Sequence, residues 1–270
     1  MPTVAELATW PFLSIVAWPS DWERGQLSAL LAETGGLDQA TLNMRLGRPP
    51  PMVLERVDPS PAARMIRDLV DSGGDGFLFT LDDLAGLGPT LGISDLGVTE
   101  GAIDVELRAG PRTSLRFDTI QVLVRAQLAR TETHRRQPPR HGMHIGGRSR
   151  TWDSIKAEFE SSVTREVKTS DKLDLHTTDG SVYQVDGDRF AYLALGALRG
   201  HSDKANMDSI CDLLSHLCPD AVVDTWYTLW RPPSGHDKLV VPNMTAGRDD
   251  PRFAFYSRWA ALTYRHVLAG

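Results

Sequence analysis

The sequence contains few cysteines and no long apolar run, and each absence excludes a class of protein. Because no stretch of 18 apolar residues occurs, we expect no membrane-spanning helix. The first 18 residues carry no Lys or Arg ahead of their apolar residues, which argues against a secretory signal peptide. Cys211 and Cys218 are the only two cysteines, and on one helix they would lie roughly 10 Å apart, beyond disulfide reach. We therefore expect reduced thiols and a cytoplasmic protein.

Local catalytic and cofactor motifs are also missing. The chain has no Walker loop, no dinucleotide-binding glycine fingerprint, no Gly-x-Ser-x-Gly elbow and no His-Glu-x-x-His motif. Its one histidine cluster, His134, His141 and His144, has no cysteine nearby, and a metal site needs further, correctly oriented ligands. We therefore expect no metal and no cofactor, and we favour a non-enzymatic protein. A hydrolase remains an alternative, because active sites also assemble from residues scattered along a chain.

Charge is distributed unevenly along the chain. The formal net charge is -6, which gives no general attraction to nucleic acid or anionic lipid. Between residues 125 and 150, however, seven arginines and a single acid, Glu132, give a local net charge of +6. Arginine forks match phosphate geometry, so this cluster is an alternative nucleic-acid or anion site. The absence of base-stacking aromatic residues within the run instead favours a solvated or internally paired loop. The candidate anion-binding residues are Arg135, Arg136, Arg140, Arg148 and Arg150.

The first 82 residues predict a small α/β module. Apolar runs at residues 14–18, 52–54 and 77–79 are typical of strands. Apolar residues also recur at helical spacing in three segments, each with a capping residue before it and a Gly or Pro stop after it. The expected helices lie between Asp21 and Thr34, between Asp38 and Gly47, and between Asp58 and Gly73.

Over roughly residues 12–82, this layout resembles the C-terminal domain of the bacterial ribosomal stalk protein. The matching features are Gly36-Leu37, the break at Pro49-Pro50-Pro51, Asp58 with Ala62-Ala63, and Gly73-Gly74 ahead of Phe77. In that family, lysines of the helix–turn–helix region help to bind translation factors. Here residues 37–40 carry no lysine, and the nearest basic residues, Arg45 and Arg48, are the candidate partner-binding residues. The rest of the chain has nothing in common with a stalk protein, so we do not expect a ribosomal component.

The remaining residues predict a second, β-rich module. Residues 83–100 are rich in Gly, Leu and Asp with little periodicity, and we expect a linker there. Residues 101–230 contain several short alternating runs, which are typical of half-buried strands, followed by a helix. Strands before one helix, and the fragment Leu115–Ile120, resemble a pleckstrin-homology-like barrel of small bacterial proteins. The basic segment 130–172 would be an insertion in that barrel, and residues 231–270 a tail with a docking helix.

These patterns predict an α+β fold. It consists of a small βααβ-type module that resembles the stalk domain, then a mostly antiparallel β module with a C-terminal helix. Both resemblances imply a bacterial protein. Small folds of these two kinds usually bind other molecules, so the leading hypothesis is an intracellular protein-binding or regulatory protein without catalytic activity. Nothing in the sequence specifies an oligomeric state. Anion binding through the arginine cluster and a hydrolase with dispersed catalytic residues are the alternatives.

Overall fold

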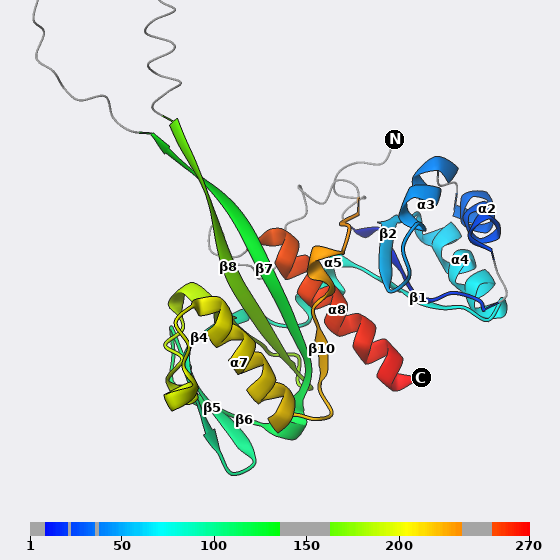
Figure 1. Cartoon of the computed structure of the whole chain (residues 1–270). Helices are drawn as coiled ribbons and strands as arrows, with labels where there is room; N and C mark the ends of the chain where they lie inside the picture. Colours follow the sequence, from blue (N-terminus) through cyan, green and yellow to red (C-terminus); the bar gives the residue numbers. More distant parts are fainter. Residues whose placement is uncertain (1–8, 21–22, 36–37, 136–162, 234–249) are drawn as a thin grey trace, which may run out of the picture.

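The chain forms an α+β structure, as predicted, with two sheets and a long helix between them (Figure 1). The computed structural model describes residues 9–20, 23–35, 38–135, 163–233 and 250–270. Among these residues, no helix is both long enough and apolar enough to cross a bilayer.

The first module is a three-stranded antiparallel sheet covered by three helices, and the predicted order of strands and helices is confirmed. Its strands lie in the order β2-β1-β3, with β2 and β3 at the two edges. Leu13 and Ile15 of the central strand are fully buried in a core that the helices complete. The elements are β1 (Phe12–Ala17), α2 (Arg24–Gly35), α3 (Gln39–Arg45), β2 (Met52–Arg56), α4 (Pro59–Asp71) and β3 (Asp75–Phe79).

Helix α4 shows how the local sequence sets an element of this module. The carboxylate of Asp58 accepts the backbone N–H of Ser60, and Pro59 occupies the first turn, where its missing N–H costs nothing. Met65 and Leu69 then lie on the buried face of the helix. The helix ends before Gly73, whose φ of 84° favours glycine.

Close packing at Gly76 of β3 leads to a first prediction. A Cβ atom at this position would lie 2.5 Å from the carbonyl oxygen of Ser14 and 3.0 Å from a methyl group of Leu69. We expect Gly76→Ala to lower the free energy of unfolding by about 2 kcal/mol, because either backbone or core must move. Urea denaturation measures the effect. Gly97→Ala on a strand of the second sheet is the matched control, since nothing lies within 4 Å of the added atom. Equal stabilities of the two variants would contradict the prediction.

The second sheet has seven strands in the order β10-β7-β8-β9-β4-β5-β6. One antiparallel meander consists of β7, β8 and β9, and the other of β4, β5 and β6. The two meanders are joined by a parallel pairing of β4 with β9, and β10 pairs in parallel with β7. The strands are β4 (Thr90–Thr99), β5 (Ala102–Leu107), β6 (Arg112–Arg116), β7 (Ile120–Arg135), β8 (Val163–Thr177), β9 (Val182–Asp186) and β10 (Val222–Asp224). Short 3-10 helices lie at η1 (Phe117–Thr119), η2 (Gly187–Arg189), η3 (Leu193–Leu198) and η4 (Trp226–Thr228).

Helix α7 (Asp203–Leu217) lies across this sheet (Figure 1). Its Met207, Ile210 and Leu214 are fully buried in a cluster with side chains of both meanders. The sequence offers Ser202 or Asp203 as the cap of this helix, and the cap is Ser202, whose side chain accepts the N–H of Ala205. Both cysteines, one on the helix and one at its C-terminal end, are free thiols, as predicted, and both are buried.

Two predicted boundaries are wrong. Residues 83–100 are not a linker, because they contain the end of α5 (Leu81–Ala85) and the whole of β4. Glycines weaken the local strand signal there, while β9, which pairs with β4, lies about 90 residues later in the chain. The basic insertion is also shorter than 130–172, since β7 and β8 pair as far as Arg135 and Val163. Residues 136–162, including His141 and His144, lie outside the described residues.

Helix α8 (Pro251–Ala269) packs between the two sheets and is the docking helix expected in the tail. Its Phe255 and Trp259 are buried in one cluster with Phe12 of the first module and Val124 of β7. The indole Nε1 of Trp259 donates a hydrogen bond of 3.0 Å to the hydroxyl of Ser14. The tail is therefore not a separate third piece, because its helix joins the two modules into one core.

Candidate ligand-binding pocket

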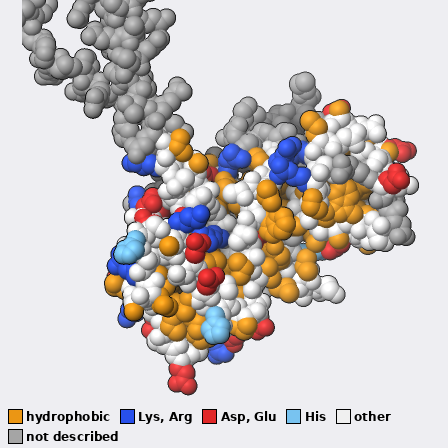
Figure 2. Space-filling model, viewed as in Figure 1, with side chains coloured by type: hydrophobic (Ala, Val, Ile, Leu, Met, Phe, Trp, Pro, Cys, Tyr) orange, Lys and Arg blue, Asp and Glu red, His pale blue; other side chains and the backbone are white. Residues whose placement is uncertain are grey.

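A pocket of about 480 Å³ lies at the junction of the two modules, within the roughly 300–1,000 Å³ typical of ligand sites. Three separate parts of the chain line it. They are Arg45 with residues 48–53, then Trp226 with residues 229–231, and finally Tyr256 and Trp259 of α8. Figure 2 shows hydrophobic side chains gathered over this junction, with Lys or Arg side chains beside them.

The floor of the pocket is a packed aromatic cluster. The ring of Trp230 lies 5.2 Å from that of Tyr256 and 6.2 Å from that of Trp259, measured between centroids. Tyr256 is held in place because its hydroxyl bonds to the carboxylate of Asp224, at the end of β10. Proximity to this carboxylate and above all burial raise the pKa of Tyr256, so the phenol stays protonated. The floor is therefore fixed before any ligand arrives.

The walls carry apolar side chains that water still reaches. Trp226 is 57% exposed and Leu229 is 54% exposed, although both are large and apolar. Pro49, Pro50 and Pro51, which connect α3 to β2, also line the pocket. Adjacent exposed apolar side chains around a hollow are typical of interaction sites.

The charged side chains among the described lining residues have one sign. They are those of Arg45, Arg48 and Arg231, and this described part of the lining includes no Asp or Glu. Arg45 also donates a hydrogen bond of 3.1 Å to the carbonyl oxygen of Pro232, which ties α3 to the segment after η4. Arg48 and Arg231 are exposed. The pocket therefore offers apolar contact in its interior and positive charge at its rim.

The structure places the predicted site residues in two very different settings. Arg45 and Arg48, the candidate partner-binding residues, both line the pocket. Of the candidate anion-binding residues, Arg135 is the last residue of β7, and the other four lie outside the described residues. The aromatic residues of the pocket were missed. The stretch from Trp226 to Trp230, with three aromatic residues in five, was the signal that could have found them.

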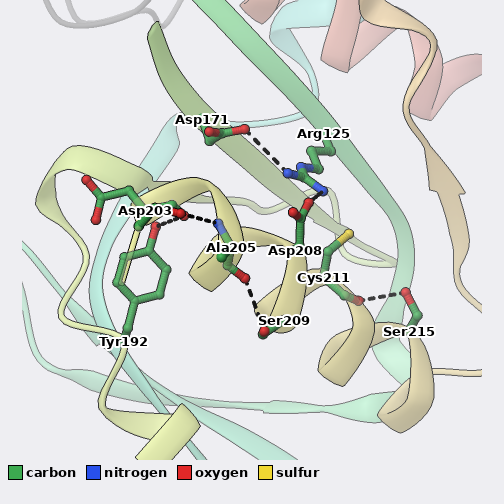
Figure 3. A network of polar contacts seen from close by, with 10 residues as sticks. Arg125, Asp171, Tyr192, Asp203, Ala205, Asp208, Ser209, Cys211 and Ser215 are labelled. Atoms are coloured by element: carbon green, nitrogen blue, oxygen red, sulfur yellow. Dashed lines mark hydrogen bonds and ion pairs between the residues drawn. The ribbon is translucent and has the colours of Figure 1, made fainter. Parts of the chain in front are cut away.

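Arg125, a member of the same basic run, is held by two carboxylates (Figure 3). Its guanidinium lies 3.4 Å from Asp171 of β8 and 2.5 Å from Asp208 of α7. The thiol of Cys211 lies beside this network, and burial, the largest cause, raises its pKa. A thiol with a raised pKa is a poor nucleophile. The network therefore fastens α7 to the β7–β8 ribbon and does not form a reactive centre.

A buried Asp174, His176 and Ser257 cluster has the residue types of a hydrolase triad but not its arrangement. Ser257 donates to a carboxylate oxygen of Asp174 at 2.6 Å, so Nε2 of His176, at 2.7 Å, must donate to the serine. All three side chains are buried, and burial lowers the pKa of His176 to about 3. An imidazole that weakly basic does not accept the serine proton, and no substrate reaches it. The cluster binds α8 to β8, and it gives no support to the hydrolase alternative.

Neither a search for metal-binding clusters in the described residues nor comparison with known proteins points to another functional site. In the described part of the chain, no three His, Cys, Asp or Glu side chains are grouped to hold a metal ion. Comparisons of the chain with protein-family models, curated proteins and solved structures returned no match. The function is therefore argued from the geometry of the pocket.

Proposed function

We propose that this protein binds another protein without catalysing a reaction, and that the junction pocket takes an apolar side chain flanked by acidic residues. The observation that carries the proposal is the combination of an apolar, aromatic pocket with three rim arginines and, among the described lining residues, no acidic side chain. The two candidate residues from the sequence, Arg45 and Arg48, belong to this rim.

The composition of the site supports a protein ligand. Trp, Tyr and Arg are the residues most enriched among those that dominate protein–protein binding energy. The aromatic floor is packed before binding, so little conformational freedom is lost when a partner enters. Trp226 and Leu229 on the pocket wall stay more than half exposed, which leaves apolar surface for a peptide to cover.

Selection of peptides from a displayed random library against the full chain tests this proposal. We expect selected peptides to carry a bulky apolar residue next to Asp or Glu, since these complement the floor and the rim. Leu229→Ser should lower the affinity of the protein for the synthetic peptides at least tenfold, which corresponds to about 1.4 kcal/mol. Arg48→Glu should also lower this affinity, and the loss of affinity should be smaller at high salt. Isothermal calorimetry measures both changes.

Leu198→Ser is the matched control, because Leu198 is 78% exposed and lies on η3, away from the pocket lining. It should leave peptide affinity unchanged. Failure to select any peptide, or equal losses from the variants at Leu229 and Leu198, would refute the proposal. The arginine cluster beyond Arg135 remains a separate prediction, tested by salt-dependent binding to single- and double-stranded nucleic acid.

A further inference from the structure

The pocket borders an outer strand of the first β-sheet. β2 is an edge strand of the first sheet, and among the described residues its only strand partner is β1. An edge strand leaves every second pair of backbone N–H and C=O groups without a ladder partner. Such an edge is a template for pairing with another extended chain.

The two strand residues in the pocket lining locate that edge. Consecutive residues of a strand point to opposite faces of the sheet. Met52 packs into the helical core of the first module, whereas Val53 packs into the cluster around α8. Both are buried, yet both line the pocket. Neighbouring residues on opposite faces thus both border the hollow, which places it against the start of β2, at the backbone that joins them.

The residues before β2 fix where pairing could begin. Pro49, Pro50 and Pro51 have no backbone N–H and cannot donate to an added strand. β2 begins at Met52, so donors for an added strand begin at Met52 or Val53, whichever N–H points away from β1. Pro49, Pro50 and Pro51 therefore line the pocket without offering a backbone donor, while β2 after them offers backbone hydrogen bonds.

We propose that the partner segment binds in an extended conformation and adds to the first sheet as a further strand alongside β2. One of its side chains enters the aromatic pocket, and its acidic residues lie toward the rim arginines. This inference rests on the proposed function and states how the segment is recognised. Backbone pairing supplies a general affinity, and the pocket selects the side chain.

Charge argues for an acidic partner over a second copy of the chain. A second copy would bring its own rim arginines to a surface that already carries Arg45, Arg48 and Arg231. Like charges across an interface oppose association, so the charge of this surface disfavours self-pairing. An acidic segment meets the same charges with the opposite sign.

Backbone N-methylation of the best selected peptide tests the inference, because a methyl group removes one N–H without changing the side chain. Each residue of the synthetic peptide is methylated in turn, and affinity for the full chain is measured. We expect alternating effects, with at least tenfold losses at every second residue and less than twofold losses between them. In the protein, hydrogen exchange of backbone amides within residues 52–56 should slow at least tenfold on binding.

Amides of β6, the edge strand of the second sheet, are the control and should exchange at unchanged rates. A peptide that binds but shows losses at helical spacing, or no protection in β2, would overturn strand addition while leaving the pocket as a binding site. Dimerisation of the free protein through β2, seen by sedimentation with protected β2 amides, would also overturn it. Absence of any binding peptide would reject the proposed function and this inference together.

Discussion

Arg258→Ala should lower the free energy of unfolding by about 3–5 kcal/mol, among the largest effects of any single substitution in this chain. Arg258 is only 1% exposed, in the middle of α8. Its guanidinium donates to the carbonyl oxygens of Leu84 at 3.0 Å and Gly88 at 2.8 Å, and to the hydroxyl of Thr90 at 3.1 Å. Removing it deletes three hydrogen bonds that join α8 to residues 84–90, and it also opens a cavity.

Arg252→Ala is the matched control, because Arg252 is an exposed residue near the start of the same helix. It should change stability by less than about 0.5 kcal/mol. Chemical denaturation followed by tryptophan fluorescence and by circular dichroism measures both variants. A loss below 1 kcal/mol for Arg258→Ala would show that water or neighbouring groups replace its hydrogen bonds.

His176→Gln should remove a contribution that makes the protein less stable in acid. Burial, first, and the charges of Arg258 and Arg265 lower the pKa of His176 from 6.5 to about 3 in the folded protein. As pH falls below 6.5, the unfolded chain binds a proton that the folded chain refuses, so folding stability declines. Between pH 7 and pH 4 this loss amounts to roughly 3 kcal/mol. The glutamine does not titrate, and its amide can still donate to Ser257.

The titration of Asp174 changes folding stability in the opposite direction to that of His176. The effect of His176 is therefore seen by comparing the wild type with His176→Gln. Burial is the main cause that raises the pKa of this carboxyl from 3.8 to about 6. The folded chain therefore gains stability as pH falls from 6 to 3.8, which offsets much of the histidine effect. In the wild type, the contributions of His176 and Asp174 should nearly cancel, so that together they change folding stability little between pH 4 and 7. In His176→Gln only the contribution of Asp174 remains, so the stability of this variant should rise toward pH 4.

Urea denaturation at several pH values measures the difference between the two proteins. His216→Gln is the control, because the imidazole of His216 is exposed on α7 and takes no part in the buried cluster. A difference between His176→Gln and the wild type that stays constant with pH would contradict the assignment of a neutral, buried imidazole.

The sequence predicted the elements that depend on neighbouring residues. Asp58 and Pro59 mark the start of α4, and Ser202 marks the start of α7, because capping and helical periodicity are local. It failed for β4, whose Gly92 and Gly97 weaken the strand pattern. Pairing with β5 and β9 overrides that weakness, and β9 is too distant in sequence to be recognised from the pattern of β4 alone.

Of the residues that line the pocket, the sequence singled out only Arg45 and Arg48 as candidate binding residues. The resemblance to the stalk domain drew attention to Arg45 and Arg48, but for their position after a helix–turn–helix and not for a pocket. Trp226 and Trp259 line the same hollow from elsewhere in the chain, and no spacing rule connects them with Arg48. Tertiary packing of α8 brings the three together, so the site exists only once the modules have joined.

The position of α8 along the chain has a consequence for biosynthesis. Ser14 and Trp259, which are hydrogen-bonded across the core, are 245 residues apart in sequence. At a synthesis rate of roughly 5–20 residues per second, the first module waits on the order of 10–50 seconds for α8. Its helical core can close in that time, but Phe12 and Phe79 stay uncovered on the other face of the sheet. The nascent chain should therefore be most vulnerable to aggregation in this interval, and most in need of a chaperone.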